Sequence, residues 1–189
     1  MTIFVWTKIG TEAGESVSDI IERKAREQRA GNGIFWWGIG TSLGPALRDE
    51  AQRAGGILPV IFCEILGKPQ KHDVAPTSTV SWVKWRDWNG REFDVPPFVQ
   101  VTSRGEDRKG GRKDKHYALV CHLPSKIEIN RKGQLFDPKN CRTFAGKVPG
   151  DSQNTALLRG DFTQPRPNDR YRIVFIANLV KPWQATLIR

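Results

Sequence analysis

The stretch that decides the fold is GIFWWGIGTSLGPALRDEAQRAGGILPVIFCEIL, residues 33–66. Its first eight residues are apolar and bounded by glycines, which favours a short strand. Thr41 or Ser42 is placed to cap the helix that follows, and Pro45 fits its first turn. Residues 57–66 are rich in branched apolar side chains and carry little charge, which is typical of a buried strand. The stretch therefore predicts a strand, a helix and a strand in succession.

Upstream of this stretch, the chain predicts one more strand and one more helix. Residues 2–9, TIFVWTKI, are dominated by branched and aromatic side chains, as strands are. Ser16 is followed three residues later by Asp19, which is the spacing of a capping box at a helix start. The helix then carries apolar residues on one side and ends at Gly31 and Gly33, so we expect it to pack against the sheet.

Downstream, the pattern is mainly one of strands. Residues 79–88, TVSWVKWRDW, and 91–103, REFDVPPFVQVTS, form a predicted hairpin around Asn89-Gly90, a dipeptide typical of primed turns. Residues 116–123, HYALVCHL, predict another strand. Residues 171–180, YRIVFIANLV, predict the last long strand, after which the final residues add at most a short one.

The element order predicts an α+β fold with a small, mostly antiparallel β-barrel flanked by helices. A length of 189 residues fits one domain, residues 1–189. Within it we expect a basic loop at 104–116 and an irregular segment at 124–170, which holds five prolines and little periodicity.

The charge of the chain points to an acidic partner. Thirty Lys and Arg against twenty Asp and Glu give a formal net charge of +10. Such an excess is typical of proteins that bind DNA or RNA. No run of about 18 apolar residues predicts a membrane span, and MTIFVWTKIGTEAGE lacks the pattern of a secretory signal. Three cysteines without a CxxC pair suit a reducing compartment, so we expect a cytoplasmic protein with no membrane partner.

The basic loop RGEDRKGGRKDKH, residues 104–116, is the first candidate for phosphate contacts. It holds six basic and three acidic residues. Basic residues along a loop position a nucleic-acid backbone without reading its sequence, although such runs are often only solvated. With two cations of the predicted hairpin, the candidate phosphate-binding residues are Lys84, Arg86, Arg104, Arg108, Lys109, Arg112, Lys113 and Lys115.

Seven tryptophans provide the second signal. Trp36 and Trp37 are adjacent in a predicted strand, so one is expected to pack inward and the other to face a pocket. The glycines on both sides leave room for a ligand near the backbone. Trp82 and Trp85 alternate with basic residues, the pattern expected where bases stack beside phosphate contacts. The alternative for each tryptophan is ordinary core packing.

Catalytic and metal-binding signatures are weak in the sequence pattern. His72, His116 and His122 lack the spacing of a zinc-binding pair. Cys121 and His122 are neighbours in a predicted strand, so their side chains point to opposite faces and do not form a nucleophile–base pair. Phosphate-binding loops, nucleophile elbows and zinc-deaminase motifs are missing. We therefore expect no cofactor and no metal.

The order IFVWTKI, amphipathic helix, FWWGIGTSLGPALRDEAQRAGG and ILPVIFCEILG resembles the opening of YTH and EVE domains of the PUA-like superfamily. The resemblance covers residues 2–66 best and residues 79–123 loosely. It implies a non-catalytic reader of a modified nucleobase, held in an aromatic cage of the barrel. The family segment has one Trp followed by small polar residues, whereas here two Trp precede Gly-Ile-Gly. Which Trp lines the pocket therefore stays open.

Carried over by position, the resemblance implies a base site built from several segments. Trp36 or Trp37 and one of Trp82 and Trp85 would be its walls. The residues expected near the edge of the base are Thr7, Lys8 and Ser42.

Two other functions fit the same pattern. One is an amidohydrolase acting on a modified nucleoside or base, similar to the related ASCH domains, with Lys8 and a carboxylate such as Glu64 in the site. The other is an accessory protein that uses only its basic surface. The sequence does not distinguish DNA from RNA and does not specify the modification.

Overall fold

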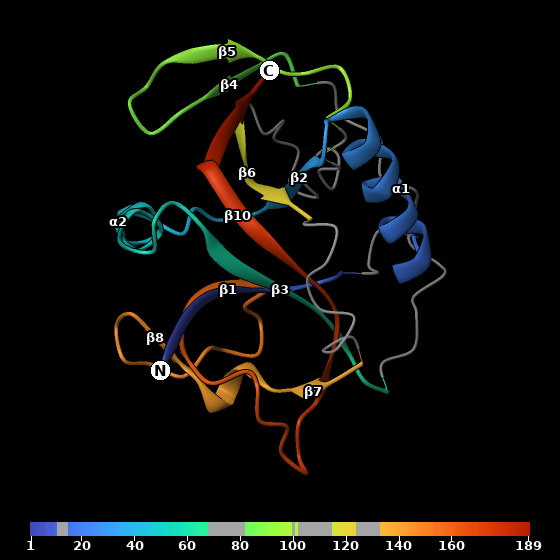
Figure 1. Cartoon of the computed structure of the whole chain (residues 1–189), viewed down its shortest axis with the longest axis vertical. Coiled ribbons are helices and arrows are strands. Elements are labelled where there is room, and N and C mark those ends of the chain that lie inside the picture. Colours follow the sequence, from blue (N-terminus) through green and yellow to red (C-terminus); the bar gives the residue numbers. More distant parts are fainter. Residues whose placement is uncertain (11–14, 68–81, 100, 102–114, 124–132) are drawn as a thin grey trace. The chain divides into compact units, whose positions relative to one another are not determined.

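The computed structural model describes residues 1–10, 15–67, 82–99, 101, 115–123 and 133–189. The chain divides into two compact units, and β10, Tyr171–Ile188, contributes its first part to one unit and its second part to the other (Figure 1). Unit 1 comprises Met1–Gly10, Leu43–Pro69 and Leu123–Leu179, and unit 2 comprises Thr11–Ser42, Gln70–His122 and Val180–Arg189.

Unit 1 is built on a sheet in the order β10-β3-β1-β9-β8, with β7 also paired to β10. The β1–β3 pair is parallel and the other pairs are antiparallel. Its strands are β1 (Thr2–Lys8), β3 (Leu58–Ile65), β7 (Leu135–Phe136), β8 (Arg142–Thr143), β9 (Thr155–Gly160) and the first part of β10, and its helices are α2 (Pro45–Arg53) and the short 3-10 helix η2 (Pro138–Asn140).

One face of this sheet carries an apolar core. Phe4 and Trp6 alternate along β1, so both side chains point to the same face. On that face they belong to one cluster with Leu158 of β9, and the ring of Phe4 meets the ring of Phe162 edge-on at 5.0 Å between centroids. The core on this face of unit 1 therefore joins side chains that are more than 150 positions apart in the chain.

Unit 2 combines a helix with several paired strands. Helix α1 (Val17–Ala30) contacts β2. β2 pairs with β6, and β4 pairs with both β5 and the second part of β10. The strands are β2 (Ile34–Ile39), β4 (Lys84–Arg86), β5 (Glu92–Asp94) and β6 (Lys115–His122).

A buried ion pair holds α1 to β2. The Lys24 ammonium lies 2.9 Å from a Glu27 carboxylate oxygen and also donates to the backbone carbonyl of Trp36. The backbone N–H of Trp36 donates to the other Glu27 oxygen. Burial lowers the pKa of Lys24 to about 8, against the opposing effect of Glu27. The backbone of Trp36 is therefore fixed by both members of the pair.

Most expected elements of the first half are confirmed. The strands at 2–9, 33–40 and 57–66 appear as β1, β2 and β3. The capping box is formed, since Ser16 Oγ accepts from Asp19 N while Asp19 accepts from Ser16 N. The expected cap of α2 is wrong: Gly44 is the N-cap, and no side chain caps this helix.

The second half departs further from the expectation. Residues 155–160 form the buried strand β9 in a segment predicted to be irregular, because the apolar run Ala156–Leu158 is completed by pairing with β1. The hairpin at Asn89-Gly90 exists with much shorter strands. Its turn is not of the primed two-residue type, since Gly90 has φ of 78° and Asn89 has no positive φ.

The α+β class is confirmed, with a mixed and mostly antiparallel sheet. Among the described residues its strand order runs from β2 to β8 without closing, so a barrel is not shown. No helix in the described ranges is long and apolar enough to cross a membrane. The three cysteines are buried and free, and burial raises the pKa of the Cys63 and Cys121 thiols, as expected for unreactive cysteines.

Candidate nucleic-acid interface

The structure brings three of the four predicted pocket tryptophans into one cluster of unit 2. Trp36 comes from β2, Trp85 from β4, and Trp82 from the residues just before β4. The rings of Trp36 and Trp85 meet edge-on, with centroids 5.4 Å apart and planes at 69°. Trp82 and Trp85, which the sequence suggested as alternatives, are thus members of the same aromatic group as Trp36.

Trp82 is a packed member of this group. It is 7% exposed, and its indole N–H donates to the carbonyl of Val101 at 3.3 Å. The His116 ring is stacked on it at 5.8 Å between centroids, and the Arg189 guanidinium lies 5.1 Å from the centre of the indole ring. These contacts account for Trp82 as a core residue.

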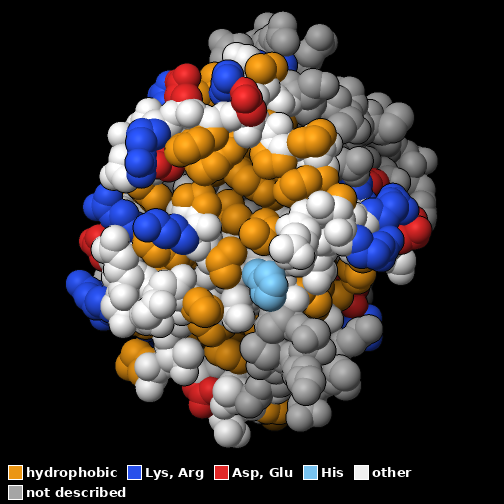
Figure 2. Space-filling model, turned by 45° about the horizontal axis from the view of Figure 1, so that its top comes forward, with side chains coloured by type: hydrophobic (Ala, Val, Ile, Leu, Met, Phe, Trp, Pro, Cys, Tyr) orange, Lys and Arg blue, Asp and Glu red, His pale blue; other side chains and the backbone are white. Residues whose placement is uncertain are grey.

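Trp85 connects the core to the surface. Its ring stacks on Phe93 of β5, with centroids 4.5 Å apart and planes at 22°. Phe93 is 41% exposed and Trp85 is half-buried, whereas Trp36 behind them is only 4% exposed. Figure 2 shows apolar side chains gathered in a patch on the face that it presents. Phe93, Trp85 and Trp36 therefore form an aromatic column with an accessible end.

Phe93 is absent from the sequence-based candidates, because the predicted hairpin has a different register from the observed one. Strand pairing about Asn89 places residues whose numbers are symmetric about this position opposite each other, so Trp85 faces Phe93. The predicted two-residue turn at Asn89-Gly90 would instead place Trp85 opposite Asp94, so the observed register differs by one residue from the prediction.

Trp37 lies on the opposite face of β2 from Trp36, because adjacent side chains of a strand alternate. It is 8% exposed. The argument that the flanking glycines leave room for a ligand is wrong for Gly38: a side chain there would meet Val101 at 2.6 Å and His116 at 3.0 Å. Close packing explains this glycine.

Lys84 and Arg86, expected to contact phosphates, are both ion-paired across the hairpin. Lys84 lies 2.5 Å from Asp94, which raises the pKa of Lys84, and Arg86 lies 2.6 Å from Glu92. Both pairs alternate with the Trp85–Phe93 pair, so they occupy the other face of the hairpin. Residues 84–94 contain three cations and three carboxylates, so the hairpin has no net charge.

The residues expected at the base edge are separated by the fold. Thr7 is 1% exposed, and its hydroxyl lies 3.0 Å from that of Thr155. Thr7 and Lys8 belong to unit 1, whereas Ser42 belongs to unit 2 and its hydroxyl accepts from Gln184 at 2.8 Å. The structure therefore does not collect these residues within one unit.

The residues suggested for an amidohydrolase do not form a pair. Lys8 lies opposite Cys63 in the β1–β3 register, on the face that carries Trp6. Glu64 follows Cys63 and so points to the other face of the sheet, where its carboxylate accepts from Arg172. No general acid–base pair results from Lys8 and Glu64.

Most candidates of the basic loop lie outside the described residues, and among the described residues no group of three or more His, Cys, Asp or Glu is placed to hold a metal ion. Lys115 starts β6, but its side chain is outside the description. The other loop candidates outside the description are Arg104, Arg108, Lys109, Arg112 and Lys113. No protein-family model, curated protein sequence or solved structure matches this chain.

Proposed function

We propose that this chain is a non-catalytic nucleic-acid-binding module that stacks an unpaired, modified base on the Phe93–Trp85 pair of unit 2. The observation that carries the proposal is the accessible aromatic column, in which Phe93 is 41% exposed and stacked on a Trp85 that Trp36 supports from the core. A base has two flat faces, and one of them would lie on this platform.

The magnitudes suit such a site. Stacking on an aromatic side chain contributes about 1–3 kcal/mol per base. Burial of an added methyl group contributes on the order of 1 kcal/mol more, which is enough to prefer a modified base. The net charge of +10 supplies general attraction to DNA or RNA that weakens with salt.

The basic loop at 104–116 provides the phosphate contacts in this proposal, because the cations of the β4–β5 hairpin are already paired. A PUA-like barrel is the fold that the order of elements in residues 2–66 favours, and it remains part of the proposal. The amidohydrolase alternative is not carried forward, since Lys8 and Glu64 occupy opposite faces of their sheet.

Replacement of the platform tests this function. We compare the binding of single-stranded oligonucleotides that differ only in one base, plain or methylated, by the wild type, Phe93→Ala and Trp85→Ala. Loss of the stack should weaken binding by roughly 5- to 150-fold and remove the preference for the methylated base. Leu66→Ala is the matched control, because Leu66 is 39% exposed and lies in unit 1.

Phe93→Ala is the more informative variant because an exposed side chain contributes little to stability. Unaltered affinity and preference in a folded Phe93→Ala protein would exclude the platform. Equal binding of plain and methylated strands by the wild type would contradict the preference for a modified base.

A further inference from the structure

One cross-strand pair of unit 1 breaks the charge pattern of the other strands. Where both members of a registered pair in the described strands are charged, three pairs are complementary: Lys84 with Asp94, Arg86 with Glu92, and Arg172 with Glu64. The fourth is Arg142 opposite Arg159 in the β8–β9 pair. Like charges placed directly opposite each other destabilise a strand pair, so this pair needs an explanation.

Both guanidinium groups are exposed and are held by uncharged partners. Arg142 donates to the carbonyl oxygens of Cys141 at 2.8 Å and Lys139 at 3.3 Å. Arg159 lies over the ring of Phe144, 4.1 Å from its centroid. No carboxylate of the described residues forms an ion pair with either arginine. Two positive charges therefore lie side by side, with no ion-paired carboxylate in the part of the chain that the structure describes.

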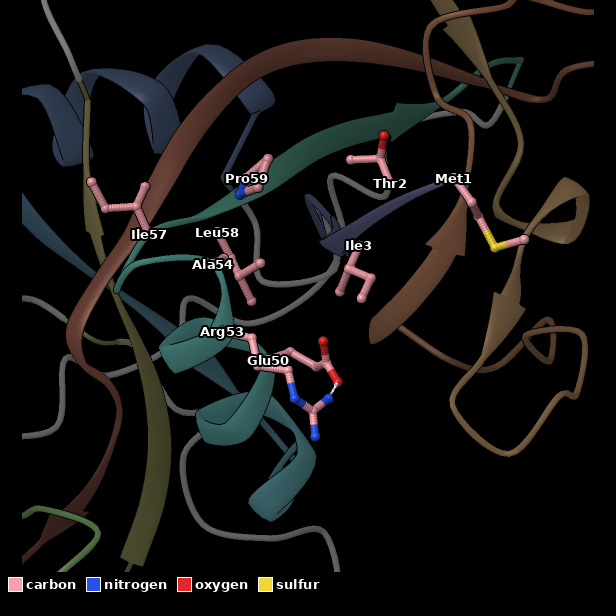
Figure 3. A pocket seen from close by; sticks show the side chains of 9 residues that line it. All are labelled: Met1, Thr2, Ile3, Glu50, Arg53, Ala54, Ile57, Leu58 and Pro59. Atoms are coloured by element: carbon pink, nitrogen blue, oxygen red, sulfur yellow. Dashed lines mark hydrogen bonds and ion pairs between the residues drawn. The ribbon is translucent and has the colours of Figure 1, made fainter.

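A pocket adjoins these arginines on the same face of the sheet. Ile3 of β1 lies directly opposite Arg159 of β9, so their side chains share a face. Ile3 also lines a pocket of about 380 Å³ between β1, the start of β3 and the end of α2 (Figure 3). Ala54, Ile57 and Leu58 make most of its remaining wall apolar.

The pocket also carries polar groups suited to the edge of a ligand. Glu50 reaches into it from α2 and is paired with Arg53, as Figure 3 shows. The Glu50 side chain is only 7% exposed, whereas that of Arg53 is 71% exposed. A carboxylate accepts from the N–H groups on the edge of a base, and a guanidinium attracts an anion.

We propose that this face of unit 1 binds a nucleoside phosphate, with the phosphate on Arg142 and Arg159 and the base in the pocket beside Glu50. A phosphate dianion balances two guanidinium charges and accepts their paired N–H groups. A small apolar pocket with a few polar groups suits a flat, partly polar ring. The choice of a nucleotide rests on the proposed function, whereas the anion site rests on the arginine pair alone.

The experiment measures binding of adenosine, guanosine, cytidine and uridine 5′-monophosphates to the full chain by calorimetry. Parallel titrations use the matching nucleosides, inorganic phosphate and a 5′-phosphorylated oligonucleotide. The test variant is Arg142→Gln with Arg159→Gln. The control is Arg26→Gln with Arg48→Gln, which removes as much charge from cations that Glu22 and Asp49 already pair.

The arginine variant should bind the preferred mononucleotide at least tenfold more weakly, since each charge-assisted contact contributes about tenfold. The control should bind as the wild type does. For the oligonucleotide, the slope of log affinity against log salt should fall by about two in the arginine variant. If the oligonucleotide binds but no mononucleotide does, the arginines contact the phosphate of a nucleic-acid chain, and the proposal of a free nucleotide is wrong.

Three results would overturn the inference. The first is that neither the mononucleotides nor the phosphorylated oligonucleotide bind. The second is that the control variant loses as much affinity as the arginine variant, and the third is that inorganic phosphate binds as tightly as every mononucleotide. Thermal unfolding checks that the arginine variant is folded. We expect it to be, because the substitutions remove a repulsion between like charges. Failure of the Phe93 platform leaves this result unchanged, because the arginine pair lies in unit 1 and Phe93 lies in unit 2.

Discussion

The β4–β5 pair of unit 2 and the β8–β9 pair of unit 1 treat their charges in opposite ways. In β4–β5, Lys84 and Arg86 each face a carboxylate. In β8–β9, Arg142 faces Arg159. The difference teaches that the number of basic residues does not locate an anion site. What favours one is the lack of an ion-paired carboxylate among the described residues, and this depends on strand register.

The same contrast holds for what lies next to the charges. The charged face of β4–β5 is balanced, and the opposite face presents the Trp85–Phe93 stack. The charged face of β8–β9 continues across Ile3 into a pocket. The first region is therefore suited to stacking and the second to an anion with an attached ring.

The largest expected effect concerns the support of the aromatic column. Trp36→Ala should lower the free energy of unfolding by about 3–5 kcal/mol, because a buried indole is lost from the core. Phe93→Ala should lower it by less than about 1 kcal/mol, since Phe93 is exposed. Urea unfolding measures both values. Similar losses in the two variants would contradict the division into support and platform.

The second effect concerns the buried pair that holds the backbone of Trp36. The pKa of Lys24 is about 8 in the folded protein, below its ordinary 10.5, because burial penalises the ammonium. Between these two values the unfolded chain holds more protons, so the unfolding free energy contributed by Lys24 should rise with pH, by about 1.4 kcal/mol per unit at most.

Denaturant unfolding of the wild type and Lys24→Met between pH 7 and 10.5 measures this contribution. The difference, wild type minus variant, should increase across the window. If Lys24→Met does not fold, Lys24→Arg provides the comparison, because a guanidinium does not titrate in this range. A flat difference would show that Lys24 keeps an ordinary pKa.

The third prediction concerns a variant in which β8–β9 has a complementary charge pair, as β4–β5 has. Arg159→Glu should place a carboxylate opposite Arg142, raise the free energy of unfolding by about 0.2–1 kcal/mol and abolish nucleotide binding. Thermal unfolding and calorimetry on the same sample check both outcomes. Lower stability would mean that the arginines do not repel each other in the unliganded protein.

The smallest effect is expected for a variant in which β4–β5 has two arginines opposite each other, as β8–β9 has. Glu92→Arg should place two guanidinium groups opposite each other at Arg86 and lower stability by a few tenths of a kcal/mol up to about 1 kcal/mol, because the pair is exposed. Its affinity for the preferred mononucleotide should stay far below that of β8–β9, which adjoins a pocket. Equal affinity in both pairs would make paired arginines sufficient and the pocket irrelevant.

Local pattern predicted much of the fold. The capping box of Ser16 and Asp19 and the apolar strands of the first half appear as expected, because their signals lie within a few residues. Strand β9 was missed because Thr155–Gly160 is short, and its partner β1 lies about 150 residues away in the sequence. The cap of α2 was misassigned because glycine at position 44 offers no side-chain signal.

For the candidate sites, too, some features were predictable from the sequence and others were not. The importance of tryptophan was predictable from composition, and Trp36, Trp82 and Trp85 do meet in one cluster. The exposed fraction of each tryptophan was not predictable. Trp82 is covered by His116, Arg189 and Val101, which come from three other segments of the chain. Arg142 and Arg159 were overlooked because seventeen positions separate them in the sequence and each is unremarkable there.

The sequence by itself determined the basic charge of this protein, its α+β class, the cap of its first helix and its abundance of tryptophan. These properties depend on composition or on neighbours a few residues apart, where side-chain and backbone geometry act directly. Only the tertiary structure decided which charges are paired, which tryptophans are covered and which strand borders the pocket. Those properties depend on register between distant strands, and a shift of one residue would exchange the face on which every side chain of a strand lies.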